Sequence, residues 1–132
     1  MEHISSPNML RRVLLVEDHD GFRQVLGKFL SEKFDVIGAK NGLEAISWLS
    51  NGLVPDVIVT DKDMPEIDGS ELLQQLRASG IWSQVPVVVI GESNDGAEAG
   101  HYYRSLGAQE YFSKPFDPFQ LQEKLLKLSG ST

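Results

Sequence analysis

Four charged side chains follow short apolar runs, in positions where they could do chemistry together. Asp61 follows one run, Glu17 and Asp18 follow another, and Lys114 follows a third. The run before Asp61 is β-branched and bounded by turn-forming residues, which is typical of a buried strand. In open α/β sheets, ligands bind beyond the carboxyl ends of the strands. We therefore predict that these side chains converge on Asp61 at one edge of a sheet.

The grouping of carboxylates with a lysine indicates phosphoryl chemistry. Several carboxylates within a few ångströms repel one another, so some must take up a proton unless a cation binds. Mg²⁺ suits such a site because it favours one or two carboxylates together with water and phosphate oxygens. Lys114 adds a compact positive charge that suits a phosphoryl group. Because an aspartate carboxylate can act as a nucleophile, the pattern predicts Mg²⁺-assisted phosphoryl transfer to Asp61.

The elements that must position these residues alternate between strands and helices. Five strand patterns are each followed by a helical pattern, which predicts an α/β fold of five βα units. Such units form a parallel sheet with helices on both faces and right-handed crossovers. The predicted strands cover residues 11–16, 34–39, 57–59, 85–90 and 108–112.

Capping residues mark the predicted helix starts. Asp18 or Asp20 could cap the first helix. Asn41 is expected to cap the second, with Glu44 in the capping-box position. The third helix is predicted over residues 69–78, and the last begins after Asp117 with a proline at its first position.

Apolar residues at helical spacing predict the buried faces of these helices. The segment 91–107 is the weakest helix, because Gly96 and Gly100 would each cost roughly 1 kcal/mol in a helix interior. We expect it to be short or mobile and anchored by Tyr103 and Leu106. The other expected buried residues are Phe22, Val25, Leu26, Phe29 and Leu30 in the first helix, Leu43, Ile46 and Leu49 in the second, Leu72, Leu73 and Leu76 in the third, and Leu121, Leu125 and Leu128 in the last.

The composition excludes several classes of protein. The chain has 132 residues, 41% of them hydrophobic, which fits one ordinary globular domain. It has no cysteine, so disulfides and Cys-based metal sites are excluded. The net charge of −7 argues against direct nucleic-acid binding, which needs a basic surface. No apolar run approaches the roughly 20 residues that span a bilayer, and we expect a cytoplasmic protein without membrane contact.

The predicted domain fills most of the chain. Residues 1–9 are polar, include a proline and lack the apolar core of a signal peptide, so we expect them to form a flexible leader. Residues 10–129 are expected to form the domain and residues 130–132 a short tail. No output domain is expected.

Three motifs, taken in order, resemble the response-regulator receiver family of two-component signalling. They are Val-Glu-Asp at residues 16–18, Asp-x-Asp-Met-Pro-x-x-Asp-Gly at residues 61–69, and Lys-Pro-Phe at residues 114–116. Each is weak alone, but together at matching strand ends they are specific, and the resemblance covers residues 11–128. It implies a flavodoxin-like fold with a five-stranded parallel sheet of order 2-1-3-4-5.

The resemblance also implies a role for each site residue. Asp61 matches the phosphorylated aspartate, and Glu17 and Asp18 match the acidic pair that holds Mg²⁺. Asp63 matches a position whose backbone carbonyl joins the metal shell, although its side chain could simply face solvent. Lys114 matches the lysine that contacts the phosphoryl group and precedes a cis proline in relatives.

One position departs from the family pattern. Receivers usually carry Thr or Ser at the end of the fourth strand, where the hydroxyl binds the phosphoryl group, but this chain has Gly91 there. Ser93 or the Gly91 backbone N–H could substitute, or the switch could be weak. Tyr111 matches the aromatic switch position. Lys62, beside the predicted phosphorylation site, could tune access or phosphate lifetime, or do nothing.

The resemblance implies a phosphoryl donor that is a sensor histidine kinase or a histidine phosphotransfer protein, and a downstream effector protein as target. We expect a monomer or weak homodimer, and a domain that assists its own phosphorylation rather than a turnover enzyme. The main alternative is a degenerate receiver that binds a partner without phosphorylation. A dehalogenase-type phosphatase is disfavoured because its Asp-x-Asp motif follows the first strand. Flavin binding is disfavoured because Glu17 and Asp18 would repel a phosphate.

Overall fold

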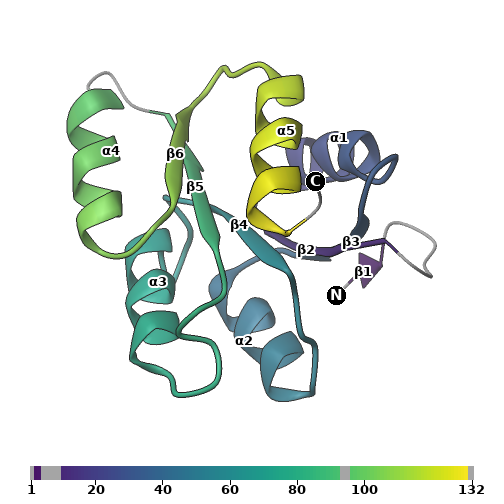
Figure 1. The fold of residues 1–132 in the computed structure, drawn as a ribbon. Helices are drawn as coiled ribbons and strands as arrows, with labels where there is room; N and C mark the ends of the chain where they lie inside the picture. Colours follow the sequence, from purple (N-terminus) through teal and green to yellow (C-terminus); the bar gives the residue numbers. More distant parts are fainter. Residues whose placement is uncertain (1, 4–9, 93–95, 131–132) are drawn as a thin grey trace.

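The computed structural model describes residues 2–3, 10–92 and 96–130 of the chain. Strands and helices alternate along it, as the sequence predicts (Figure 1). The elements are β1 (Glu2–His3), β2 (Arg12–Val16), α1 (Asp20–Leu30), β3 (Asp35–Ala39), α2 (Gly42–Ser50), β4 (Val57–Asp61), α3 (Gly69–Ala78), β5 (Val87–Gly91), α4 (Gly96–Ser105), β6 (Glu110–Ser113) and α5 (Pro118–Leu128).

The sheet has the order β1-β3-β2-β4-β5-β6. Its five longer strands pair in parallel, so the predicted flavodoxin-like order 2-1-3-4-5 is confirmed. Strand β1 adds an antiparallel edge, with Glu2 opposite Gly38 and His3 opposite Ile37. The sequence analysis expected a flexible leader over residues 1–9 and did not predict this strand, because two polar residues carry no strand pattern. The rest of that expected leader lies outside the described residues.

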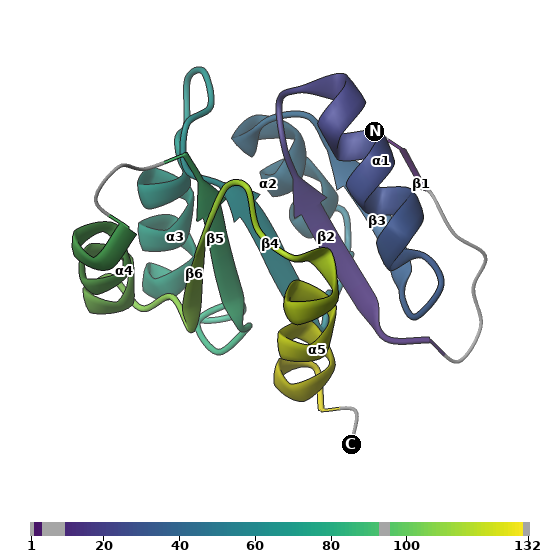
Figure 2. The same ribbon diagram turned by 90° about the horizontal axis from the view of Figure 1, so that it is seen from above.

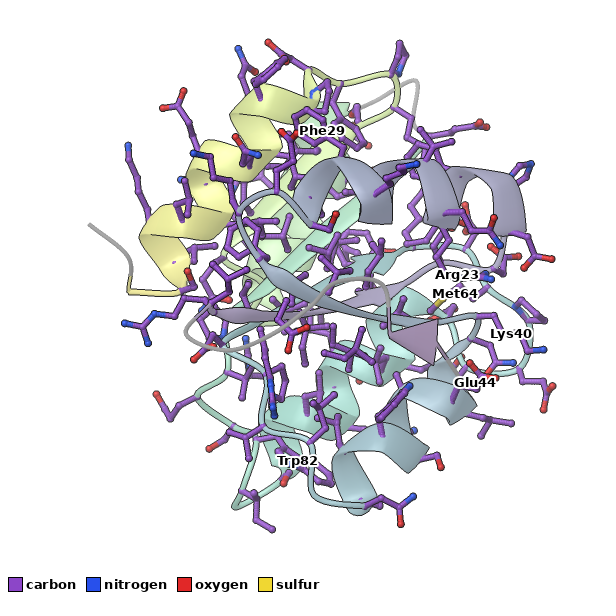
Figure 3. All side chains as sticks on the ribbon, turned by 90° about the vertical axis from the view of Figure 1, so that its right-hand side faces the viewer. Arg23, Phe29, Lys40, Glu44, Met64 and Trp82 are labelled. Carbon is purple, nitrogen blue, oxygen red and sulfur yellow. The ribbon has the colours of Figure 1, made fainter. Side chains whose placement is uncertain are left out.

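Helices cover both faces of the sheet. Figures 1 and 2 show α1 and α5 on one face and α2, α3 and α4 on the other. Alternating strand residues point into the two cores: Val57 and Val59 pack on the α1–α5 side, and Ile58 packs on the opposite side. Figure 3 shows Phe29 and Trp82 on opposite sides of the sheet. Both faces of β4 are therefore buried, which fixes the position of Asp61 at its end.

The cap of α1 differs from the prediction. The N-cap is His19, in an extended conformation, and its Nδ1 accepts a hydrogen bond of 3.0 Å from the backbone N–H of Phe22. Asp20 lies inside the helix and pairs with Arg23 at 2.9 Å. Neither Asp18 nor Asp20 is the cap, and Asp18 is left to face the carboxyl edge of the sheet.

The other predicted caps are confirmed. The Asn41 side chain accepts a hydrogen bond from Glu44 N–H at 2.8 Å, and Glu44 Oε1 accepts a hydrogen bond from Lys40 N–H at 3.0 Å. The two labelled side chains, Lys40 and Glu44, lie close together in Figure 3. Asp117 caps α5 by accepting from Phe119 N–H at 2.9 Å.

Two apolar residues that were expected to be buried are exposed, Val25 and Leu43. The buried face of α1 consists of Arg23, Leu26, Gly27 and Leu30, so Val25 lies on the flank of the helix beside α5. The buried face of α2 consists of Gly42, Ala45 and Leu49, and a Cβ at Gly42 would approach the Ile67 Cβ to 2.8 Å. Leu43 lies outside that buried face.

The segment predicted as the weakest helix contains α4. The helix runs for ten residues, with Gly96 at its start and only Gly100 in its interior. Tyr103 is buried, and Leu106 packs on the same core just after the helix. The two expected anchors are therefore confirmed.

The loop between Asp61 and α3 depends on a close approach at Gly69. A Cβ there would lie 2.6 Å from the Asp61 carbonyl oxygen and 2.9 Å from the Lys62 Cα, both backbone atoms. Asp68 and Glu71 form a full capping box at the same helix start. The Gly69 N–H also donates to the Lys62 carbonyl at 3.0 Å. The start of α3 is thus packed directly on the backbone that carries Asp61.

Replacing Gly69 with alanine should therefore destabilise the fold. We expect Gly69→Ala to lower the free energy of unfolding by roughly 1–3 kcal/mol, the usual cost of overpacking. Gly80→Ala is the matched control, because a Cβ at Gly80 meets nothing within 4 Å. Urea denaturation of both variants measures the difference, and equal stabilities would contradict the close-approach argument.

Candidate functional site

The carboxyl ends of three strands bring the predicted site residues together. The parallel register places Val16 opposite Thr60, so the residues that follow, Glu17 and Asp61, are neighbours at the edge of the sheet. Lys114 follows β6. The three residues are sequence-distant, and the convergence predicted from the sequence is found in the structure.

Lys114 links the two buried carboxylates. Its Nζ lies 3.0 Å from Asp61 Oδ1 and 3.1 Å from Glu17 Oε1. The ammonium also lies 4.5 Å from the centre of the Phe22 ring, a distance at which a cation is attracted to the ring face. The Lys114–Pro115 peptide bond is cis, as the resemblance implied. Lys114 is thereby held in one place by contacts from β2, β4 and α1.

Burial disfavours the charged forms of the two buried carboxylates and shifts their pKa values. Glu17 is 1% exposed, and burial raises its pKa, with a further upward contribution from the charge of Asp61. Burial likewise raises the pKa of Asp61, although its hydrogen bond and charge interaction with Lys114 oppose this. For Lys114, burial favours the neutral amine, but the hydrogen bond and charge of Asp61 and the charge of Glu17 outweigh it and raise the pKa. Lys114 therefore stays charged.

The donor atoms fit a hard divalent cation. Carboxylate oxygens of Glu17, Asp18 and Asp61 lie within 4.8 Å of one another. Three carboxylates face the one ammonium of Lys114, so negative charge remains in excess, and oxygen donors are the ligands that Mg²⁺ prefers. Glu17 and Asp61 are buried and Asp18 is exposed, so a cation could enter from the solvent side.

The site opens into a cleft of about 450 Å³. The cleft is lined by the three carboxylates and Lys114, and by the side chains of His19, Phe22, Asp63 and Glu92. This is room for a cation and a small anionic group, beside an aspartate at the end of a strand.

Asp63 takes part through its backbone. Its N–H donates to Asp61 Oδ2 at 3.2 Å, while its side chain is 76% exposed and pairs with Lys62 Nζ at 3.2 Å. Its side chain therefore faces solvent, which is one of the two possibilities that the sequence analysis gave for Asp63. Its carbonyl as a metal ligand stays a prediction.

Gly91 and Tyr111 are in direct contact. Gly91 ends β5, and its carbonyl accepts a hydrogen bond of 3.2 Å from the buried Tyr111 hydroxyl. The Tyr111 ring stacks on Tyr103, with ring centres 5.6 Å apart and planes within 4° of parallel. Ser93, which was considered as a substitute hydroxyl, lies outside the described residues. The role of Tyr111 as a switch stays a prediction.

Sequence reasoning did not predict the contacts of three residues that shape the site. His19 caps α1, and its backbone N–H donates to Glu17 Oε2 at 3.0 Å. Arg23 is buried and donates to the Glu17 carbonyl at 2.9 Å. Phe22 lies under Lys114. Arg23 carries a signal that could have been used, since it is a charged residue on the sheet-facing side of an amphipathic helix.

The fold and the site define an α/β domain with an acidic cluster and a lysine at the carboxyl edge of its sheet. Comparison with known proteins identifies the family of this domain. Residues 13–126 match the family model of the response regulator receiver domain. The chain therefore belongs to the response regulator receiver family. None of the helices in the described residues is both long and apolar enough to cross a membrane.

Individual relatives agree with this assignment. The chain is 31% identical over 122 residues to the chemotaxis protein CheY1 of Helicobacter pylori strain J99, covering 91% of this chain and 98% of that protein. It is 36% identical to the transcriptional regulatory protein CiaR of Streptococcus pneumoniae, covering 90% of this chain and 53% of that protein. The receiver domain of the Francisella response regulator 1452 superimposes with a TM-score of 0.83 at 30% identity, covering 90% of this chain and 96% of that one.

The raised pKa of Asp61 predicts that replacing its carboxylate with a neutral group increases the stability of the fold, by an amount that depends on pH. Because the folded state holds the Asp61 proton more readily than the unfolded chain, the ionised carboxylate lowers stability above the folded-state pKa, and this cost vanishes below the ordinary value of 3.8. In a chelator-containing buffer at pH 7, Asp61→Asn should raise the free energy of unfolding, and the gain should disappear at acid pH. Urea denaturation across pH measures it. Glu32→Gln, at an exposed position, should show no gain, and a gain independent of pH would contradict the argument.

Mg²⁺ should stabilise the folded state through the acidic cluster. A ligand that binds only the folded state adds about 2.7 kcal/mol at 100 times its Kd, so the Tm should rise as Mg²⁺ is added. Asp18→Asn removes one negative charge from the oxygen donors of the acidic cluster and should strongly reduce the rise in Tm. Glu32→Gln should leave the rise in Tm unchanged. Thermal unfolding with and without Mg²⁺ measures the effect, and an undiminished rise in Asp18→Asn would place the cation elsewhere.

Proposed function

We propose that this receiver domain is a phosphoacceptor in a two-component phosphorelay and that Asp61 takes the phosphoryl group with the help of Mg²⁺. The observation that supports it most is the position of Lys114 Nζ, within 3.1 Å of both Asp61 and Glu17. A half-buried lysine that bridges two buried carboxylates in the lining of a cleft supplies a fixed positive charge beside the nucleophile.

The chemistry follows from this arrangement. A carboxylate oxygen of Asp61 forms a bond to phosphorus, the bond between phosphorus and the donor's imidazole nitrogen breaks, and the imidazole keeps the electron pair and takes up a proton. Lys114 would neutralise charge on the phosphoryl oxygens. Glu17 and Asp18 would hold Mg²⁺, with the Asp63 carbonyl as a further ligand, and a bound Mg²⁺ supplies charge neutralisation.

The proposed donor is a sensor histidine kinase or a histidine phosphotransfer protein, and the proposed target is an effector protein. Among the relatives are a chemotaxis protein and a transcriptional regulatory protein, which supports a role in signal transduction. We propose that the domain modifies only itself and is no turnover enzyme. A cytoplasmic location, a monomeric or weakly dimeric state and the lack of nucleic-acid contact are parts of the same proposal.

A degenerate receiver that binds its partner without phosphorylation is the second candidate. Gly91 favours it, because glycine has no hydroxyl to contact a phosphoryl group. The complete set of Glu17, Asp18, Asp61 and Lys114 favours phosphorylation.

Incubation with Mg²⁺ and a small-molecule phosphoryl donor distinguishes the two candidates. We expect intact mass to show one added phosphoryl group, and Asp61→Asn to show none. Amide NMR with beryllofluoride, which mimics the phosphoryl group, then shows how far the change spreads. Shifts that reach Tyr111 would mean a working switch, whereas absence of modification would favour the degenerate receiver.

A further inference from the structure

The side chain of Lys62 lies in the space that Gly91 leaves open. A Cβ on Gly91 would approach Lys62 Cγ to 2.7 Å, Cδ to 2.8 Å and Cβ to 3.2 Å. A threonine or serine at position 91 therefore could not coexist with Lys62 in its present place. The glycine and the lysine belong together: the missing hydroxyl is replaced by a long side chain that comes from the residue after Asp61.

Lys62 directs its ammonium to Asp63, a residue that lines the same cleft as Asp61. The Lys62 side chain is only 25% exposed, so its charge is partly shielded from solvent. A second ammonium thus lies next to the cleft, paired with Asp63, in addition to the ammonium of Lys114 inside it.

The present partner of Lys62 can be exchanged. Its Nζ lies 3.2 Å from Asp63 Oδ2, on a carboxylate that is 76% exposed. Ion pairs with such exposed carboxylates contribute little free energy. A phosphoryl group on Asp61 would carry more negative charge and more acceptor oxygens than Asp63, and contacts of an ammonium with phosphoryl oxygens are among the stronger hydrogen bonds.

We infer that Lys62 takes the role of the hydroxyl missing at position 91: when Asp61 carries a phosphoryl group, the Lys62 ammonium leaves Asp63 and binds a phosphoryl oxygen. The inference rests on the proposed function of Asp61 and names a second phosphoryl-contacting residue beside Lys114. It also explains why Gly91 is compatible with the otherwise complete set of site residues.

Substitutions of Lys62 separate its charge from its bulk. Methionine keeps the methylene stem over Gly91 but removes the ammonium, and arginine keeps a positive charge. The probe is beryllofluoride with Mg²⁺, and its apparent affinity is measured by amide NMR titration. We expect Lys62→Met to bind roughly tenfold more weakly, the loss of about one hydrogen bond to a charged group, and Lys62→Arg to retain most of the affinity.

The matched control is Lys33→Met, which removes one positive charge at an exposed position beyond the end of α1. It should bind the probe as the wild type does. Raising the salt concentration should weaken binding more in the wild type than in Lys62→Met, because an ionic contact is screened and a packing contact is not.

A pair of variants tests the link between the two positions. Gly91→Thr alone should weaken binding, because the new Cβ displaces Lys62. In Lys62→Ala with Gly91→Thr, the stem is gone and the hydroxyl has room, so binding should exceed that of either single variant. Such a departure from additivity is expected only for residues in contact.

The possible outcomes distinguish the role of Lys62 from the proposed phosphoacceptor role of Asp61. If Lys62→Met and the wild type bind beryllofluoride equally while Asp61→Asn does not bind, the inference is wrong and Lys62 is only a space-filling residue. If the wild type shows no Asp61-dependent binding, the proposed function is wrong and the inference fails with it. A selective loss in Lys62→Met, recovered in Lys62→Arg, supports both.

Discussion

The placement of two buried carboxylates beside one lysine constrains the rest of this structure. Glu17 and Asp61 lie side by side because β2 and β4 are neighbouring parallel strands, and burial raises the pKa of both groups. Left alone they would favour protonation and lose the charge that a cation needs. Lys114 offsets this by contacting both at about 3 Å. The carboxylates outnumber the ammonium of Lys114, so the site keeps an excess of negative charge. A divalent cation can neutralise that excess.

The surrounding elements hold this arrangement by backbone contacts. Gly69 packs on the Asp61 carbonyl, and Gly42 packs on Ile67 in the loop that follows the site. The Asp68 capping box fixes the start of α3 at the same point. Because the Gly69 contacts are with backbone atoms, which cannot move aside, the turn after β4 has little freedom, and the Asp63 N–H stays directed at Asp61. Gly69 of the Asp68-Gly69 pair is thus needed for close packing on the backbone of β4, in addition to favouring a turn.

The fold and the centre of the site could be predicted because they depend on order along the chain. Alternating strand and helix patterns determine a parallel sheet, and a parallel sheet brings residues such as Asp61 and Lys114 to one edge. Errors arose where the outcome depended on side-chain direction. Val25 and Leu43 fit an apolar spacing but lie on helix flanks, and His19 caps α1 in place of an aspartate. Strand β1 was missed because two polar residues show no period.

The relation between Lys62 and Gly91 was the least predictable, since it arises from neighbouring strand ends and from the path of one flexible side chain. The sequence shows that a hydroxyl is missing, whereas the structure shows what fills the space. The same glycine offers its carbonyl to Tyr111 on the path toward Tyr103 and α4. Lys62 therefore packs on the residue that anchors the aromatic pair. On the proposed function, a shift of the Lys62 stem during phosphoryl binding would alter the packing at Gly91 and so act on Tyr111, without any hydroxyl at that position.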